Sequence, residues 1–369
     1  MRRVLIVLFL ILSGFLTATQ ALAVEVGGKA EVVYGGTWLE NGDFLDELTD
    51  RLDLELYLPP LGEAELCYAF RVGSPLQGLL AGKDSTYFTK KLYLKRRFSR
   101  FHLTVGRQPV SWSFGAMLNP VDYTIGAEAL EEEHDRKFTD AIEAYIPLNW
   151  NSGLTLVASF PAGFTVDPEK RKWGVRGRFG VKGYDLTVIY VQEPAAGANG
   201  HEDGAHGLIS LPPLPRQRAA FTFKGDLGDL GVYGAFGRYF GEGGENSSSY
   251  LLGADYSYKI GYYGKLTMQA EYLLLDGINL LQVLGPFMSM GGGTERTNLF
   301  TGSLAYPIDD FSAVALTAVA NPEESKYMLI PSYQNTLPGN IDLDLGLFFY
   351  LSNSEPNTTS IVVDLSYPF

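Results

Sequence analysis

The chain has 369 residues, of which 46% are hydrophobic, and carries a formal net charge of −13. This charge argues against a nucleic-acid-binding protein, because such a protein needs a basic surface to neutralise phosphates. The single cysteine, Cys67, excludes an intrachain disulfide. The 22 Tyr, 22 Phe and 42 Gly suit an all-β protein of curved, closely packed strands.

Residues 1–23 have the pattern of a secretory signal peptide. Arg2 and Arg3 precede an apolar core, and Ala21-Leu22-Ala23 forms a small-x-small cleavage site. A retained membrane anchor is the alternative, but the apolar run is shorter than the roughly 20 residues that span a bilayer. We therefore expect an exported protein with one domain over residues 24–369, either soluble in the periplasm or a β-barrel in the bacterial outer membrane.

From Val24 onwards about 18 segments alternate apolar and polar residues, with 16 as the lower alternative. Each is near the roughly 9–11 residues of a tilted membrane strand. The clearest are Arg51–Leu58, Glu63–Val72, Phe101–Gln108, Trp173–Gly180, Arg216–Lys224, Lys265–Leu275 and Ile341–Tyr350. Weaker ones are Val24–Thr37, Phe138–Ile146, Asn298–Tyr306 and Lys326–Tyr333. The pattern predicts an all-β fold, a single transmembrane antiparallel β-barrel.

The connectors alternate between long and short. Long ones are expected at 38–48, 73–83, 110–137, 161–170, 193–215 and 276–296, and tight turns near Pro59, Ser99, Pro147, Lys182, 225–229 and 307–309. Short periplasmic turns and longer extracellular loops are typical of outer-membrane barrels.

Charged residues on the inward face of the strands form two groups. We expect a basic wall made of Lys91, Lys95, Arg97, Arg100, Lys172, Arg176, Arg178, Arg216 and Arg218. The opposite arc is acidic, with Asp53, Glu55, Glu63, Glu65, Asp342, Asp344 and Asp364. Facing walls of opposite charge would create a transverse field in the lumen. The alternative is that these residues form cross-strand ion pairs that merely keep the lumen wet.

The connector 110–137 is the third long one and is strongly acidic. Its acidic residues are Asp122, Glu128, Glu131, Glu132, Glu133 and Asp135, and residues 127–136 could form a short helix. Porins commonly fold a loop at this place into the lumen, so we expect a constriction near the basic wall. A solvated acidic cap that binds divalent cations near lipopolysaccharide is the alternative.

The last nine residues have apolar or aromatic side chains at the odd positions from Ile361 to Phe369, with Asp364 and Ser366 between them and Val362 and Pro368 at the other even positions. This ending resembles the closing strand of bacterial outer-membrane β-barrels, in which the terminal aromatic residue belongs to the assembly signal. The resemblance implies that Phe369 has this role and that the barrel-assembly machinery is a partner.

A second resemblance rests on Gly106-Arg107-Gln108, Trp112 and Asp122. This pattern resembles large porin-like channels, among them the eighteen-stranded alginate-export channels, which pass an acidic polysaccharide. Their Arg-rich lumen would map onto Arg176, Arg178, Arg216 and Arg218. Two features depart from the family. The acidic arc does not suit a polyanion exporter, and Arg107 has the parity of the outward-facing Val105.

No catalytic constellation accompanies these features. His201 and His206 lack the spacing of a zinc-binding helix, and no G-x-S-x-G motif occurs. We therefore expect a channel for hydrophilic, charged solutes, without cofactor or metal. The expected partners are outer-membrane lipid, lipopolysaccharide and the solute, with a homo-oligomer possible. A dedicated transporter of an anionic polymer or metabolite is the second hypothesis, and an enzyme on a barrel scaffold the third.

Overall fold

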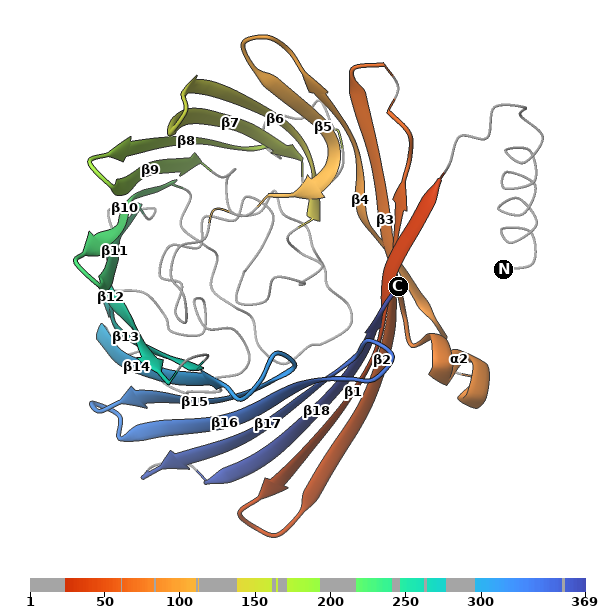
Figure 1. The fold of residues 1–369 in the computed structure, drawn as a ribbon, viewed down its shortest axis with the longest axis vertical. Coiled ribbons are helices and arrows are strands. Elements are labelled where there is room, and N and C mark those ends of the chain that lie inside the picture. Colours follow the sequence, from red (N-terminus) through yellow and green to blue (C-terminus); the bar gives the residue numbers. More distant parts are fainter. Residues whose placement is uncertain are drawn as a thin grey trace.

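The computed structural model describes residues 24–60, 62–82, 84–110, 112, 138–160, 164, 171–192, 217–240, 246–261, 264–276, 296–353 and 356–369. These residues form one 18-stranded antiparallel sheet (Figure 1). The first nine strands are β1 (Glu25–Leu39), β2 (Phe44–Tyr57), β3 (Ala64–Gly73), β4 (Thr86–Arg97), β5 (His102–Pro109), β6 (Phe138–Asn149), β7 (Ser152–Phe160), β8 (Lys172–Val181) and β9 (Tyr184–Gln192). The others are β10 (Gln217–Leu227), β11 (Leu230–Phe240), β12 (Asn246–Ile260), β13 (Gly264–Asp276), β14 (Arg296–Pro307), β15 (Ser312–Asn321), β16 (Lys326–Leu337), β17 (Ile341–Ser352) and β18 (Thr358–Pro368).

The sheet closes on itself, so the predicted all-β barrel of 18 strands is confirmed. Each strand pairs antiparallel with its neighbours in the chain, and β18 pairs with β1 from Lys29↔Pro368 to Leu39↔Thr358. Thr37 and Ser360 share a hydrogen bond of 2.9 Å between their hydroxyl groups across this seam. Closure leaves no unpaired sheet edge, which an open sheet would expose.

Large apolar side chains form the outer surface of the barrel. In β18, Leu365 and Tyr367 point outward and are exposed, whereas Asp364 lies opposite Val33 on the inner face. The same outward exposure recurs at Leu94 of β4 and Leu252 of β12. A continuous apolar surface of this kind fits a hydrocarbon solvent better than water.

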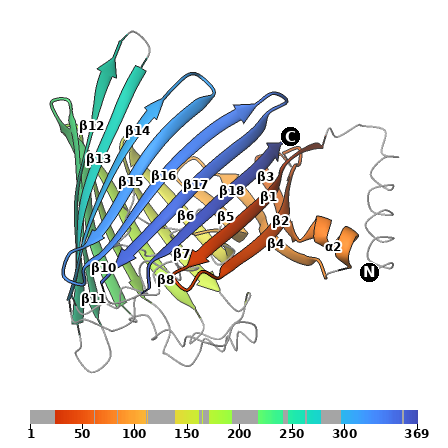
Figure 2. The ribbon, with the colours of Figure 1, turned by 90° about the horizontal axis from the view of Figure 1, so that it is seen from below.

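The two ends of the barrel differ. At the short-turn end, the strands are joined by tight turns, and both the start of β1 and Phe369 lie there (Figure 2). The backbone groups of Gly28 and Phe369 exchange two hydrogen bonds of 2.9 and 3.0 Å at this end. The opposite end, which we call the long-loop end, carries the longer connectors.

Two connectors differ from expectation. The predicted long connector 38–48 is a tight turn over residues 40–43, because β1 and β2 extend into it. Gly42 has a φ of +88°, and the rings of Trp38 and Phe44 pack at 4.8 Å, which holds the two strand ends together. The connector 73–83 contains a short helix, α2 (Pro75–Ala81), that begins at a proline.

Among the described residues, no helix is long and apolar enough to cross a membrane.

Candidate functional site: the lumen

The lumen of the barrel carries most of the charged side chains that the strands provide. Residues directly opposite each other on paired strands point to the same face, so the register assigns each side chain to the lumen or to the outer surface. The inward rows include Asp53 and Glu55 on β2, Arg176 on β8, and Asp344 on β17.

An ion-pair cluster occupies the lumen face of β2, β3 and β4. Asp53 accepts hydrogen bonds from Arg71 at 2.8 Å and from Lys90 at 2.9 Å, and these three side chains are largely buried. Glu55 pairs with Lys91 at 3.0 Å. Arg71 is on the adjacent strand β3, whereas Lys90 and Lys91 reach across β3 from β4, so these charges neutralise one another locally.

This cluster corrects part of the expected charge separation. The sequence pattern predicts Lys91 and Glu55 on opposite walls, and likewise Arg97 and Glu65, but Lys91 pairs with Glu55 and Arg97 pairs with Glu65 at 3.3 Å. The physical reason is that β2, β3 and β4 are neighbours, so inward charges on them come within reach across the sheet. On these three strands the alternative of cross-strand ion pairs describes the arrangement.

A β-bulge explains why Lys90 joins the cluster. The β3–β4 register passes from Ala69↔Lys91 to Phe70↔Thr89, which leaves Lys90 as the extra residue. A bulge re-aims one side chain out of strict alternation. Lys90 therefore faces the lumen together with Lys91, which alternation alone does not predict.

A second set of charges does lie on opposite sides of the barrel. The predicted basic residues on β8 and β10 are Lys172, Arg176, Arg178 and Arg218, of which Arg178 pairs with Asp185 of the neighbouring β9 at 2.9 Å. The acidic residues on β17 and β18 are Asp342, Asp344 and Asp364. β8 and β17 are nine positions apart in the ring of 18 strands, which is half of the circumference. Asp344 stands directly opposite Asp364 in the register, so two carboxylates are adjacent on this wall.

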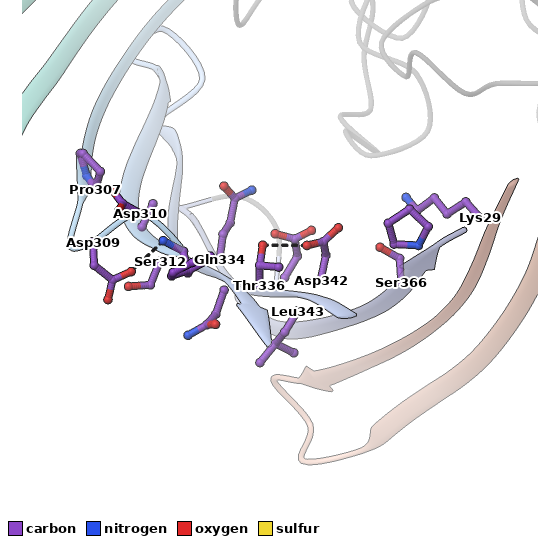
Figure 3. A pocket seen from close by; sticks show the side chains of 15 residues that line it. Lys29, Pro307, Asp309, Asp310, Ser312, Gln334, Thr336, Asp342, Leu343 and Ser366 are labelled. Atoms are coloured by element: carbon purple, nitrogen blue, oxygen red, sulfur yellow. Dashed lines mark hydrogen bonds between the residues drawn. The ribbon is translucent and has the colours of Figure 1, made fainter. Parts of the chain in front are cut away.

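A cavity of about 550 Å³ lies at the short-turn end beside the acidic wall. Figure 3 shows Gln334, Thr336, Asp342 and Ser366 on its inner side, and Leu343 pointing to the other side of the sheet. The Thr336 hydroxyl donates to Asp342 at 2.8 Å. In the turn before β15, the Phe311 N–H donates to Asp309 at 2.8 Å and holds the pKa of that carboxyl below its usual value.

The Gly106-Arg107-Gln108 segment has a structural role at the β4–β5 seam. Gly106 has a φ of +129°, and a Cβ there would lie 2.2 Å from the Leu92 carbonyl oxygen. Arg107 donates to the Thr89 carbonyl at 2.6 Å, and its guanidinium lies 4.9 Å from the centre of the Phe88 ring. Arg107 therefore ties β5 to β4 beside the bulge, with its guanidinium on the ring of Phe88, which the register places opposite Arg71 on the lumen face.

Trp112 is buried and contacts the basic wall. The guanidinium carbon of Arg176 lies 5.3 Å from the centre of its ring. Val110, two residues earlier, is also buried and belongs to the same apolar cluster as Ile189. The start of the third long connector therefore lies inside the barrel. The acidic residues Asp122, Glu128, Glu131, Glu132, Glu133 and Asp135 lie outside the described residues, as does the expected helix over 127–136.

Part of the lumen face is apolar, which the charge pattern of the strands does not predict. Leu251, Leu273, Leu275 and Leu299 occupy inward positions of β12, β13 and β14, and each is at most 1% exposed. The sequence does contain a signal for this apolar part of the lumen, because in the run Leu273-Leu274-Leu275 both faces of the strand are apolar near the long-loop end. At the lower edge of this region, Tyr233 donates to Glu271 at 2.7 Å across Gly253.

Several predicted wall residues lie elsewhere. Arg100 is exposed in the short turn between β4 and β5, where Phe98 and Phe101 stack at 4.6 Å. Glu63 precedes β3 and pairs with Arg96 at 3.2 Å, with both side chains more than half exposed. Lys95, in contrast, lies on the lumen face as predicted by alternation, opposite Thr104. Arg216 and the proposed signal peptide fall outside the described residues.

Two further charged groups belong to the lumen although the pattern did not single them out. Glu143 of β6 stands in the electrostatic field of Arg176 and Lys95, and Glu271 of β13 is 3% exposed. Within the described ranges, no group of three or more His, Cys, Asp or Glu side chains could hold a metal ion.

The fold is that of bacterial porins. One similar structure is OpdQ of Pseudomonas aeruginosa, with a TM-score of 0.60, 10% identity, and coverage of 94% of this chain and 99% of that one. The anion-selective porin of Comamonas acidovorans has a TM-score of 0.50, 14% identity, and coverage of 94% and 99%. Wzi of Escherichia coli, a carbohydrate-binding β-barrel involved in capsule assembly, has a TM-score of 0.57, 14% identity, and coverage of 97% and 88%. No protein-family model and no curated protein sequence matches the chain. The described chain is thus a porin-like, closed antiparallel β-barrel.

Proposed function

We propose that this protein is an outer-membrane channel that passes small hydrophilic, charged solutes through its lumen. One observation carries the proposal: basic side chains on β8 and β10 stand seven to nine strand positions away from the carboxylates of β17 and β18, on the other side of the ring of 18 strands. Charges on opposite walls of a low-dielectric barrel create a transverse field, which favours polar and charged solutes over apolar ones. An apolar outer surface and a ring of 18 strands, within the range of about 16–18 that leaves an aqueous channel, support the same conclusion.

The third long connector would narrow this channel. The contact between Trp112 and Arg176 supports an entry of the connector into the lumen on the side of the basic wall. Its six acidic residues would then lie near Arg176, Arg178 and Arg218, where opposite charges stabilise an inward position. Phe369 at the barrel seam would serve the barrel-assembly machinery as a recognition signal, after export by the signal peptide over residues 1–23.

A dedicated transporter of an anionic polymer or metabolite is the second candidate. Lys172 of β8 and Arg218 of β10 are both buried on the lumen side of the barrel wall. This concentration of positive charge favours an anionic solute. The carboxylates of Asp344 and Asp364 on the other side disfavour a long polyanion. We therefore place small charged solutes first, and we expect no enzymatic activity.

The proposal is tested by solute flux into proteoliposomes that contain the purified, folded barrel. We expect liposome swelling with small neutral and charged sugars, and different rates for sugar acids and amino sugars of matched size. The absence of any flux from a folded, inserted barrel would contradict a channel. Flux that is blocked by an acidic oligosaccharide, but not by a neutral one of equal length, would favour the second candidate.

A further inference from the structure

The helix α2 exposes leucine side chains outside the barrel. Leu79 and Leu80 are 83% and 86% exposed, and Leu76 on the same short helix is 48% exposed. Figures 1 and 2 both place α2 beyond the ring of strands, next to β2 and β4. A hydrophilic connector would have no reason to present three leucines in this way.

The start of α2 is fastened to an outward-facing carboxylate. Asp50 of β2 lies opposite Val32, and Val32 lies opposite the outward Leu365, so Asp50 is on the outer face. The Leu76 N–H donates to the Asp50 carboxylate at 2.5 Å, and the Ser74 N–H donates to the Asp50 carbonyl at 2.7 Å. Asp50 is only 5% exposed.

This arrangement has a clear electrostatic reason. A carboxylate on the hydrocarbon-facing side of a barrel is unfavourable unless donors satisfy it. The first N–H groups of a helix are free donors at the positive end of the helix dipole. The helix therefore covers the Asp50 carboxylate and presents leucine side chains at the outer surface in its place.

We propose that α2 is a lipid-contacting element, whose Leu76, Leu79 and Leu80 lie among the acyl chains of the outer leaflet. The proposal rests on the membrane location that the proposed function assumes. The leucines continue an existing apolar surface, because Leu48 of β2 and Tyr87 of β4 are exposed on the same outer face. Three leucines expose much less than the roughly 800 Å² per partner that a stable protein interface buries, so a second copy of the chain fits less well.

Single-cysteine labelling tests this inference. In a Cys67→Ser background, an environment-sensitive fluorophore is attached to Leu79→Cys, to Leu252→Cys on the strand belt, or to Asn41→Cys in the turn between β1 and β2. Each labelled protein is reconstituted in phosphatidylcholine vesicles with brominated acyl chains, and quenching is compared with quenching by aqueous iodide. We expect the bromolipid to quench the labels at 79 and 252 strongly, and iodide to quench the label at 41.

The label at position 252 distinguishes a failure of the lipid contact of α2 from a failure of the proposed membrane channel. If the bromolipid quenches position 252 and iodide alone quenches position 79, α2 lies in water and the inference is overturned, while the membrane barrel stands. If position 252 is not quenched by bromolipid either, the barrel is not in the bilayer and both proposals fail. Efficient disulfide formation between two Leu79→Cys chains would also overturn it, in favour of a contact between copies.

Discussion

Arg176 of β8 lies with its guanidinium carbon 5.3 Å from the centre of the Trp112 ring, which follows β5 in the chain. An arginine over an indole face is stabilised by about 0.5–2 kcal/mol, with more where water is excluded. The contact fixes the position of one positive charge on the wall and brings the connector after β5 to it. It is the point at which the predicted basic wall and the predicted constriction meet.

Removal of this charge should change the ion selectivity of the channel. At an effective dielectric constant of about 20, a unit charge about 8 Å from a permeating ion contributes about 2 kcal/mol before salt screening. We expect Arg176→Gln to reduce the ratio of anion to cation permeability several-fold, measured as a shift in reversal potential across a salt gradient. Arg96→Gln is the matched control, because Arg96 stands opposite Ala64 on the outward face near the rim. Equal shifts in both variants would refute the assignment.

Neutralising the opposite wall should act in the other direction. Asp344 and Asp364 are directly opposite each other in the β17–β18 register, so the two carboxylates act on the same region of the lumen. The double variant Asp344→Asn, Asp364→Asn should raise the preference for anions and move the reversal potential opposite to Arg176→Gln. Asp229→Asn, in an exposed turn at the same end, controls for the loss of one carboxylate charge away from this wall. A shift of the same sign as that of Arg176→Gln would contradict facing walls.

The ion-pair cluster on β2–β4 should matter for stability. Asp53 is shared by Arg71 and Lys90, and the three side chains are 11–16% exposed. Asp53→Asn leaves two largely buried cations without their carboxylate, so we expect a loss of about 2–4 kcal/mol in the free energy of unfolding. Glu65→Gln breaks a pair that is more than half exposed and should cost less than about 1 kcal/mol. Urea unfolding in detergent, followed by heat-modifiable electrophoretic mobility, measures both losses. Equal losses in the two variants would contradict the claim that the buried ion pairs contribute more to stability than the exposed one.

Gly106 should tolerate no side chain. Its φ of +129° and the 2.2 Å approach of a Cβ to the Leu92 carbonyl mean that Gly106→Ala strains the β4–β5 seam. Strain of this kind costs on the order of 1–3 kcal/mol. Gly35→Ala on β1 is the control, because nothing lies within 4 Å of a Cβ there. The yield of folded barrel in refolding experiments should fall for the first variant only; a normal yield would show that the seam can adjust.

The barrel itself could be predicted from the sequence because its signal is repeated many times. Alternation in single segments is weak, but the closing strand from Ile361 to Phe369 and the regular spacing of turns point to one architecture. The ends of the strands are harder to predict than their existence. Turns such as Asn41-Gly42 depend on local backbone geometry, so the extension of β1 and β2 into residues 38–48 escaped prediction.

The lumen could be predicted only in part, because alternation tells which residues face inward but not which of them meet. The pairing of Glu55 with Lys91 depends on strand neighbours and register, and the inward position of Lys90 depends on a bulge. The burial of Leu273 and Leu275 could not be predicted from alternation, because it depends on their position on the lumen face near the long-loop end of β13. The assignment of Arg176 and Asp344 to opposite walls needed only the strand order in a closed ring.

The most direct test of the channel is a planar-bilayer recording of the purified, folded barrel. The account predicts stepwise ohmic conductance from single insertions, with a reversal potential that Arg176→Gln moves toward cation preference. A folded barrel that inserts without conductance, or whose reversal potential does not respond to Arg176, would contradict it.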